Sequence, residues 1–588
     1  MNFELYFMKK SILLLILTLF LFRTNAQTLE KLRCENEENP MGLEIKNPRL
    51  SWQMKSSLRG AKQNAYQILV ADNEADLKKD NGNVWNSGMV KTDKLYNIKY
   101  EGKSLESRKK YFWKVKVWNE KNKPTAYSEA ASWEMAIIEK ADWSAHWIGK
   151  NSAESNPPKS IELQKEFNLA KRATRARIYV TSLGAYHLIF NGKKIGQEVF
   201  AQTLTNNVNE LNYQIYEISN DDLSIGINFI TVTLGNAWWG SNVDWLKEKA
   251  PKNDGFCKLL FQLELEFYDG SRQMVVSDGS WKTRVSPIIS NTISVGEIYD
   301  ARLEYGKDWE NAAMMDETMS NVNLKYAQLS QQKTIDIIKA TKITEPKKGR
   351  YVLDFGKNII GFVHLEAEGK AEKEIEIKYS DVLTDKGLVE QTSLLSVFSN
   401  NDKNIPTDKY IFKGYGIEKW QPKFTFHSFR YIEVEGFSKK PDINTLVAKA
   451  VFENSPFVEN ILNSEKVLEK IYGEKPNPKA NLEDSKIIIS PTLATETKKI
   501  ETNYGLLTSQ SNLQGKKYSL KLSIPANTSI QIELPIENGK TINNVKESGK
   551  PIVVRNKPAR LLGINYLKTE NNKAVFVVLS GNYEFTIE

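Results

Sequence analysis

The chain has 588 residues, enough for roughly four domains of ~150 residues, and a formal net charge of +9 at pH 7. Its lysines are scattered among acidic residues, whereas a nucleic-acid surface needs them gathered with base-reading motifs. We therefore expect no nucleic-acid partner. The two cysteines, Cys34 and Cys257, are too few and too far apart for a disulfide scaffold, and each is expected to be a buried small apolar residue.

The N-terminus has the pattern of an export signal. Lys9 and Lys10 precede an apolar run, Ser11 to Phe22, and the small residue Ala26 suits a signal peptidase. The run is shorter than the ~20 residues that span a bilayer. We expect residues 1–26 to be a signal peptide, the mature protein to be periplasmic or secreted, and no membrane anchor to be present.

Short β-branched and aromatic runs with a period of two, separated by Gly, Asn, Asp and Pro, recur along the mature sequence and predict an all-β protein. Residues 27–140 are predicted to form a sandwich of the immunoglobulin or fibronectin type III kind. The odd-numbered residues of 111–118 share one face, so Trp113 is expected in the core. Residues 141–332 are predicted to form a jelly-roll-like sandwich. Its expected strands are 176–180, 186–190 and 261–267, and its expected hairpin turns are Asn191-Gly192 and Asp269-Gly270.

A third sandwich is predicted over 333–440. Helical periodicity follows in Pro456 to Tyr472, within a helical and linker region at 441–500. A final β unit is predicted over 501–588. The expected fold is therefore a series of β-sandwiches with one short helical segment.

Several motifs occur in a fixed order along the chain. The N-terminal ones are Leu32-Arg-Cys-Glu35, Asn47-Pro-Arg-Leu-Ser-Trp52, Arg59-Gly60 and Trp85-Asn-Ser-Gly88. The central ones are Leu234-Gly-Asn-Ala-Trp-Trp239, Gly296-Glu-Ile-Tyr-Asp-Ala-Arg302 and Pro422-Lys-Phe-Thr-Phe-His-Ser-Phe-Arg-Tyr431. The C-terminal ones are Ile524-Pro-Ala-Asn-Thr528, Glu547-Ser-Gly549 and Ser580-Gly-Asn-Tyr583. Together they resemble bacterial α-L-rhamnosidases of glycoside hydrolase family 78.

This resemblance implies a catalytic (α/α)6 barrel between the third sandwich and the final β unit, but no part of the sequence resembles its acidic motif. The segment from Pro456 to Tyr472 resembles only the barrel's first helix. Twelve helices of ~11–12 residues need about 140 residues, whereas Pro456 to Leu513 offers 58 positions. We therefore expect the barrel to be missing and assign no catalytic residue.

Glycoside hydrolysis needs two carboxyl groups, and the sandwiches contain acidic pairs. Glu374 and Glu376 share a strand face with Lys378, so a solvated face is expected. The pair Glu264 and Glu266 alternates with apolar residues in the same way and is expected on a solvated face too.

The four histidines have no partner at the spacing of a zinc site, and no other metal motif occurs, so no metal ligand is assigned. His427 lies among aromatic residues and is expected to be hydrogen-bonded at a sheet surface.

Carbohydrate binding is easier to place, because aromatic rings stack on sugar faces and polar side chains satisfy hydroxyl groups. Asn236, Trp238 and Trp239 follow a predicted strand, although the tryptophans could instead pack against a neighbouring domain. Glu297 and Asp300 lie in an expected loop that is either a polar pocket or purely structural.

The resemblance implies that residues 141–332 are similar to a rhamnose-binding module, which in some family members uses calcium. It adds Asn191 to the candidates, while no calcium ligand is assigned and no other cofactor is expected. The family often has Gly where this chain has Ala237.

Three functions remain open. The first is a rhamnosidase-derived protein that binds a carbohydrate such as an L-rhamnose-containing glycan and has no catalytic power. The second is an active α-L-rhamnosidase that hydrolyses terminal α-L-rhamnosyl linkages. The third is a degenerate or interaction protein with no ligand of its own.

Overall fold

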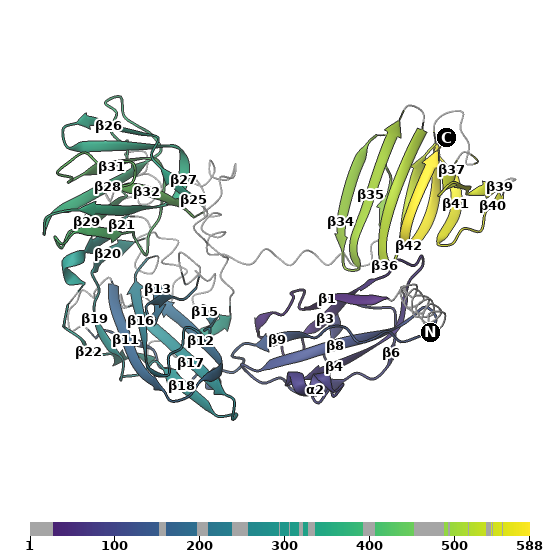
Figure 1. The fold of residues 1–588 in the computed structure, drawn as a ribbon, viewed down its shortest axis with the longest axis horizontal. Coiled ribbons are helices and arrows are strands. Elements are labelled where there is room, and N and C mark those ends of the chain that lie inside the picture. The colour runs from purple at the N-terminus through teal and green to yellow at the C-terminus, as the bar shows by residue number, and fades with distance from the viewer. Residues whose placement is uncertain are drawn as a thin grey trace, which may run out of the picture. The chain divides into compact units, whose positions relative to one another are not determined.

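The protein is seen in a computed structural model that describes residues 27–151, 160–196, 201, 210–237, 257–292, 295–304, 306–316, 322–326, 336–391, 406–451, 487–491, 494–514, 517–536, 543, 545–554 and 557–587. The chain forms two compact units, one of residues 1–138 with 476–588 and the other of residues 139–475. The described residues form mainly strands (Figure 1), which confirms the predicted all-β sandwiches. The predicted signal peptide and the predicted helix at Pro456 to Tyr472 lie outside the described residues.

The N-terminal sandwich of the first unit contains two sheets. One has three strands, β1 (Thr28–Cys34), β3 (Arg49–Lys55) and β7 (Ile98–Lys99). The other has six, β2 (Met41–Leu43), β9 (Ala131–Met135), β8 (Lys110–Asn119), β4 (Gln63–Ala71), β5 (Trp85–Asn86) and β6 (Val90–Lys91). Because side chains alternate along a strand, the odd-numbered residues of β8 face the core, and Trp113 is buried there as predicted.

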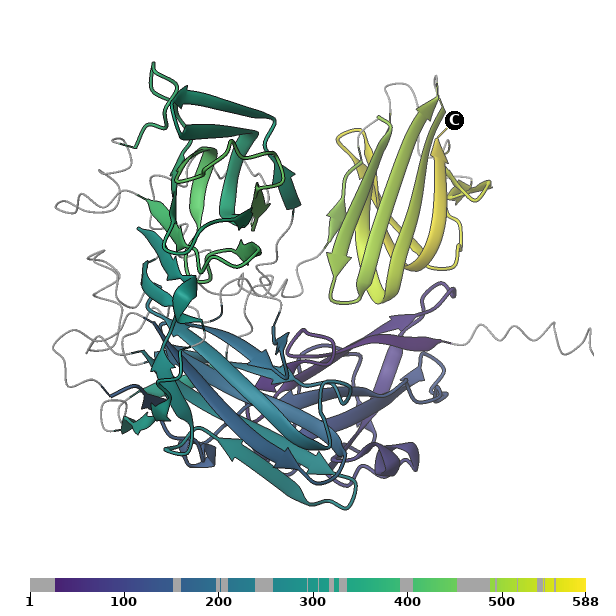
Figure 2. The same cartoon turned by 60° about the vertical axis from the view of Figure 1, so that its left-hand side comes forward.

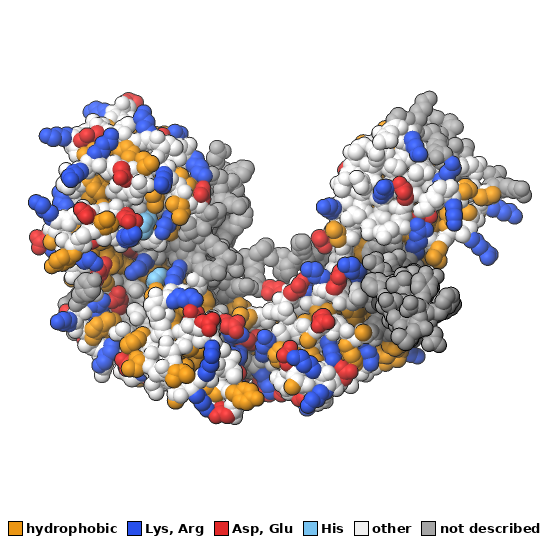
Figure 3. Space-filling view, in the orientation of Figure 1, with side chains coloured by type: hydrophobic (Ala, Val, Ile, Leu, Met, Phe, Trp, Pro, Cys, Tyr) orange, Lys and Arg blue, Asp and Glu red, His pale blue; other side chains and the backbone are white. Residues whose placement is uncertain are grey.

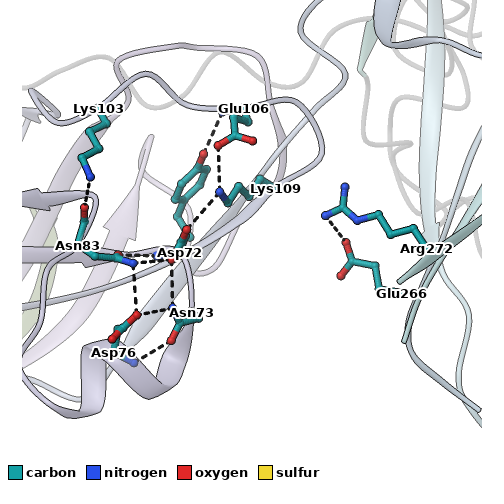
Figure 4. Close-up of polar contacts among 10 residues, drawn as sticks. Asp72, Asn73, Asp76, Asn83, Lys103, Glu106, Lys109, Glu266 and Arg272 are labelled. Carbon is teal, nitrogen blue, oxygen red and sulfur yellow. Dashed lines mark hydrogen bonds and ion pairs between the residues drawn. The ribbon is translucent and has the colours of Figure 1, made fainter. Parts of the chain in front are cut away.

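The sequence pattern did not predict the short helix α2 (Glu74–Lys78) between β4 and β5. Its N-cap residue Asn73 accepts a hydrogen bond from the backbone N–H of Asp76 at 2.8 Å. The Asn83 amide donates to Asp72 at 2.7 Å and to Asp76 at 3.3 Å (Figure 4). The hydrogen bond from Asn83 to Asp72 is the largest cause of the lowered pKa of Asp72. A helix this short has no amphipathic stripe, so only its cap could have revealed it.

The C-terminal sandwich belongs to the same unit. Its eight-stranded sheet contains β34 (Glu496–Thr502), β35 (Gly505–Gln514), β36 (Lys517–Pro535), β42 (Lys573–Ile587), β37 (Val545–Glu547), β38 (Lys550–Pro551), β33 (Ile488–Ile489) and β41 (Ile564–Glu570). The strands β39 (Val553–Val554) and β40 (Lys557–Pro558) form a separate pair. The register of β36 against β42 shifts between Ile524 and Ser529. Asn527 adopts a left-handed φ of +62° within this irregularity.

The second unit begins with a jelly-roll-like pair of sheets, whose long strands are blue and teal in Figure 2. The seven-stranded sheet contains β23 (Ala313–Met314), β10 (Ile148–Gly149), β17 (Lys258–Phe267), β12 (Ala173–Leu183), β15 (Glu210–Glu217), β24 (Asn323–Tyr326) and β18 (Arg272–Val276). The six-stranded sheet contains β14 (Lys193–Lys194), β13 (Ala185–Phe190), β16 (Gly226–Gly235), β11 (Ser160–Leu169), β19 (Lys282–Val285) and β22 (Glu310–Asn311). Short 3-10 helices lie at η1 (Lys140–Asp142) and η2 (Ala301–Leu303).

The strands of the third predicted sandwich are all connected by hydrogen bonds into one ten-stranded sheet. It contains β20 (Ile288–Thr292), β21 (Gly296–Asp300), β29 (Thr407–Ile411), β28 (Glu374–Ser380), β31 (His427–Glu435), β27 (Arg350–Glu368), β32 (Leu446–Ala450), β25 (Asp336–Lys339), β26 (Lys342–Lys347) and β30 (Ile417–Trp420). The long strand β27 pairs with β26 and β31 and then with β30 and β32. Its register against β31 shifts between Asp354 and Ile359, around a left-handed Gly356.

One predicted solvated face is wrong. Glu264 in β17 is 5% exposed and accepts a hydrogen bond from Gln262 at 2.9 Å. The backbone N–H of Ser144 donates to Gln262, so the chain ahead of β10 covers this face of the sheet. Glu266 is half-exposed and pairs with Arg272 at 2.9 Å (Figure 4). Period-two alternation separates two faces but does not say whether another segment covers the polar one.

The predicted face of β28 agrees with its ion pairs. Lys409 contacts Glu374 and Glu376 at 2.8 Å each, and Lys378 and Glu376 form a further pair at 2.5 Å. These partly exposed carboxylates are therefore neutralised by neighbouring lysines on their own sheet.

Both cysteines are buried, as predicted, and neither forms a disulfide with a described residue. On the face of the molecule in Figure 3, Lys and Arg side chains are interspersed with Asp and Glu. No helix among the described residues has the length and apolar character needed to cross a membrane.

Candidate functional site

Asn191 occupies a tight turn between β13 and β14, as predicted, with a left-handed φ of +47°. Its amide nitrogen donates to the carbonyl of Asp222 at 2.9 Å and to Asn228 Oδ1 at 2.8 Å. Its Oδ1 accepts from the backbone N–H of Phe229 at 2.8 Å. The amide therefore holds the turn together through three internal hydrogen bonds.

Asn236 follows β16 directly and is buried. Its Oδ1 accepts a hydrogen bond from Cys257 Sγ at 3.0 Å. The next residue, Ala237, has a left-handed φ of +46°, and its N–H donates to Asn291 Oδ1 at 2.8 Å. This conformation explains why a glycine suits the position, because a Cβ in the left-handed region costs roughly 1–2 kcal/mol. The predicted sugar-stacking residues Trp238 and Trp239 lie outside the described residues.

The end of β16 packs closely on the third sandwich. A Cβ at Gly235 would lie 2.2 Å from Phe424 Cδ2, so only glycine fits under this ring. Gly235 is paired in register with Ala185 and Ser160 on its two neighbouring strands. Asn191 lies six residues beyond Ala185, or about 20 Å along the chain at ~3.3 Å per residue. The predicted candidates Asn191 and Asn236 therefore mark opposite ends of the six-stranded sheet.

Glu297 lies in strand β21, so its predicted placement in a loop is wrong. Its side chain is fully buried, and Oε2 accepts hydrogen bonds from the backbone N–H groups of Lys423 at 2.9 Å and Phe424 at 3.2 Å. Oε1 has no hydrogen-bond partner among the residues that the structure describes. Burial raises the pKa of Glu297 to about 8, and Asp408 adds to the rise while Lys423 opposes it. These causes favour the protonated, neutral form of Glu297 at neutral pH.

Asp408 is the second buried acid of this cluster. Its Oδ1 accepts from the backbone N–H of Glu297 at 2.8 Å, and its Oδ2 accepts from the Tyr379 hydroxyl at 2.6 Å. His427 Nε2 lies 3.2 Å from the same oxygen, and its ring stacks on Tyr379 at a centroid distance of 4.0 Å. His427 is hydrogen-bonded as predicted, but it is 6% exposed, so its expected place at the sheet surface is wrong.

Asp300 ends β21 and also lies in a strand rather than the predicted loop. Its carboxylate accepts from Arg302 Nε at 2.9 Å and from a terminal nitrogen of Arg302 at 2.8 Å. It also caps η2 by accepting from the backbone N–H of Arg302. These Arg302 bonds, the largest cause, lower the pKa of Asp300. Asp300 is thus engaged in a local clamp.

The structure brings two of the predicted residues, Asn236 and Glu297, to one cluster. Asn291, which accepts from Ala237, is paired with Glu297 in the β20–β21 hairpin. Lys423 approaches from the third sandwich, and with burial as the larger cause it lowers the pKa of the nearby His187 to about 3.

Asp408, Tyr379 and the role of Lys423 were not predicted from the sequence. The one available signal was the Pro422 to Tyr431 motif, whose residues were recognised but whose contacts were not.

A neutral acid beside a hydrogen-bonded carboxylate has the composition of an acid–base pair, but both carboxyl groups are fully buried. In the described structure they stabilise packing rather than face solvent. The described residues contain no group of three or more His, Cys, Asp or Glu arranged for a metal ion, so no calcium ligands are assigned.

The terminal motifs meet within the first unit. Arg59 donates to both carboxylate oxygens of Glu547, at 2.5 and 3.0 Å, and to the carbonyl of Asn582 at 2.9 Å. Its guanidinium also lies 4.2 Å from the centre of the Tyr583 ring. Asn527 accepts from the backbone N–H of Gln63 at 3.0 Å. Motifs from both ends of the sequence thus form one contact between the N-terminal and C-terminal sandwiches.

Four domain families match the chain in order. They are the Rha78A-like N-terminal immunoglobulin domain at 29–139, the alpha-L-rhamnosidase N-terminal domain at 171–341, the bacterial alpha-L-rhamnosidase concanavalin-like domain at 344–452 and the bacterial alpha-L-rhamnosidase C-terminal domain at 480–549. Between the last two matches lie residues 453–479, a stretch of 27 residues. Twelve helices need about 140 residues, so this interval has no room for a barrel.

An alpha-L-rhamnosidase of Formosa agariphila is 30% identical over 477 residues, which are 74% of this chain and 50% of that protein. The chain therefore spans about half the length of this curated relative. The solved structure of alpha-L-rhamnosidase from Dictyoglumus thermophilum has a TM-score of 0.72 and 19% identity, covering 96% of this chain and 100% of that one. The structure of the Streptomyces avermitilis alpha-L-rhamnosidase has a TM-score of 0.70 and 16% identity, with the same coverage.

At these identities the solved structures establish a shared fold, while the ordered domain matches and the curated relative establish kinship. The chain belongs to the bacterial α-L-rhamnosidase family, glycoside hydrolase family 78, and lacks that family's catalytic barrel.

Proposed function

We propose that this chain is an exported protein that binds an L-rhamnose-containing glycan and does not hydrolyse it. Export rests on the signal-like residues 1–26, and recovery from the culture fluid or periplasm of a protein beginning at Gln27 would support it. The family's non-barrel domains are those that match, which favours binding over catalysis.

The observation that carries the loss of hydrolysis is the interval of 27 residues where the barrel would stand. Inverting hydrolysis needs an acid and a base ~6.5–9.5 Å apart with a water between them. Glu297 and Asp408 are both fully buried, so neither reaches a substrate in solution. Glu374 and Glu376 are neutralised by Lys409.

Carbohydrate binding is supported by the retained N-terminal rhamnosidase domain at 171–341. The Streptomyces avermitilis structure of the same fold is described as complexed with L-rhamnose. Trp238 and Trp239 follow the turn at Ala237, which Asn291 and Cys257 anchor through buried hydrogen bonds.

Isothermal titration of the full chain with L-rhamnose, with and without calcium, tests this binding. We expect saturable heat with a dissociation constant on the order of 1 mM, equivalent to ~4 kcal/mol. A Trp238→Ala, Trp239→Ala variant should bind about tenfold more weakly, because it removes the apolar ring area that a sugar face would cover. Trp118→Ala provides a control, since Trp118 is a partly exposed tryptophan in β8 of the other compact unit. Absence of heat in both conditions would contradict binding.

A protein without a ligand is the second candidate. Its support is that four predicted sugar-binding side chains already form hydrogen bonds within the protein. They are Asn191, Asn236, Glu297 and Asp300. The same titration separates the two candidates, because only the first predicts heat that falls in the tryptophan variant.

A further inference from the structure

The β20–β21 hairpin is an arm that joins two sandwiches of the second unit. The chain leaves the jelly roll after β19, forms β20 and β21 in the sheet of the third sandwich, and returns to the jelly roll at β22. Strand β21 pairs in parallel with β29. Gly296 begins β21 with a left-handed φ of +127°, and a Cβ there would lie 2.2 Å from the carbonyl of Thr407. The arm is thus seated tightly against its neighbour.

Glu297 is the buried polar residue at the contact between this arm and the rest of the sheet. Its Oε2 accepts two backbone N–H groups, from Lys423 and Phe424, in the segment between β30 and β31. Its Oε1 is buried, and no described residue hydrogen-bonds to it. An ionised carboxylate needs donors on both oxygens to offset its loss of water. The geometry therefore suits a carboxylic acid that carries its proton.

The groups around Glu297 favour the same state. Asp408 from β29 has donors on both oxygens, from the backbone of Glu297 and from the Tyr379 hydroxyl. His427 from β31 contacts the same carboxylate. Asp408 is the acid better placed to hold a negative charge, and a second charge on Glu297 would repel it. Lys423 acts in the opposite direction and lowers the pKa of Glu297. Burial keeps the pKa of Tyr379 well above its usual range. Burial also lowers the pKa of His187 on β13, so its imidazole is neutral.

We propose that the β20–β21 hairpin is a proton-dependent clasp, in which Glu297 holds the jelly roll to the third sandwich while its side chain carries a proton and loosens the arm when that proton is lost. The clasp does not require the protein to bind a glycan. The role falls to a buried acid with one oxygen that has no hydrogen-bond partner in the described part of the chain.

The sign of the pH dependence follows from linkage. The pKa of Glu297 is about 8 in the folded protein and ~4.3 when exposed. Between these values the folded state binds one more proton than the unfolded state, so stability falls as pH rises. The equilibrium constant for opening should increase roughly tenfold per pH unit across this window and become constant above it.

Hydrogen exchange of the full chain, followed by mass spectrometry from pH 5 to pH 9 and corrected for intrinsic rates, measures opening of residues 288–300. The wild type should open more readily as pH rises, with a plateau above the folded pKa. Glu297→Gln should remove this slope. Glu264→Gln, at a buried carboxylate of β17 in the same unit, should keep it. A slope retained in Glu297→Gln, or absent in the wild type, would overturn the proposal.

Infrared spectroscopy provides a readout that does not depend on the variant folding. The wild type should show the carbonyl stretch of a protonated carboxylic acid at pH 7, and that band should fade by pH 9. Its absence at pH 7 would overturn the clasp, even if Glu297→Gln proved too unstable to study.

Discussion

Arg59→Ala is expected to destabilise the first unit by about 3–5 kcal/mol, because it leaves the buried Glu547 carboxylate without its partner. Glu547 is 2% exposed, and Arg59 holds both of its oxygens. The change also removes the cation–π contact with Tyr583 and the bond to the carbonyl of Asn582. Urea titration followed by segment-resolved hydrogen exchange should show β36 and β42 exchanging at lower urea.

The pH dependence of this effect separates a lost charge pair from lost packing. Burial alone raises the pKa of Glu547, but the hydrogen bonds from Arg59 and Ser548 outweigh it and leave the pKa lowered. The pair therefore contributes stability above the unfolded value of ~4.3, and that stability is lost as pH falls through the folded value. The difference between wild type and Arg59→Ala should shrink in acid.

Arg33→Ala is the matched control, because Arg33 lies in the same sandwich and its closest carboxylate, Glu38, is 3.9 Å away and half-exposed. An exposed pair of this kind is worth ~0–1 kcal/mol. Equal losses of stability in the two variants would show that Glu547 does not depend on Arg59.

Gly235→Ala is the second change with a large expected effect. The added methyl group would overlap the Phe424 ring, whose Cδ2, Cε2 and Cγ atoms lie 2.2–2.6 Å from its position. Phe424 is 1% exposed and donates its backbone N–H to Glu297, so its displacement also disturbs that hydrogen bond. Overpacking costs about 1–3 kcal/mol, and we expect the upper end of this range in thermal unfolding of the second unit.

Two comparisons make this expectation specific. Gly279→Ala, in a turn of the same unit with its nearest contact at 3.9 Å, should change stability by less than ~0.5 kcal/mol. In a double-mutant cycle with Phe424→Ala, the two changes should be less harmful together than their sum, because the methyl group then enters vacated space. If the losses of stability in the two single variants simply add in the double variant, overlap with the Phe424 ring is not the cause of the Gly235→Ala effect.

Local pattern was sufficient for much of the fold. Period-two alternation places Trp113 in the core, and Asn-Gly in a positive-φ turn joins β13 to β14. These features depend on neighbours within one or two strands, where the sequence carries the physical signal directly. The burial of Glu264 could not be predicted from its neighbours in the sequence. It depends on which distant segment covers that face of the sheet.

The site was harder to predict because its contacts join distant parts of the chain. Glu297 meets Asp408 and Phe424 only after the β20–β21 hairpin pairs with another sandwich. Arg59 meets Glu547 across 488 positions of sequence. A contact between two single side chains so far apart produces no periodic pattern in the sequence. The motifs that contain these residues could therefore be recognised, but the contacts they make could not be predicted.

We propose that this rhamnosidase relative binds carbohydrate but has no hydrolytic centre. Loss of hydrolysis is tested by the release of phenol from an aryl α-L-rhamnoside by the purified full chain, with and without calcium, beside a barrel-containing family member. We predict no release above the uncatalysed rate, because residues 453–479 cannot hold the barrel. Turnover that co-elutes with this protein and saturates with substrate would show that the chain hydrolyses rhamnosides.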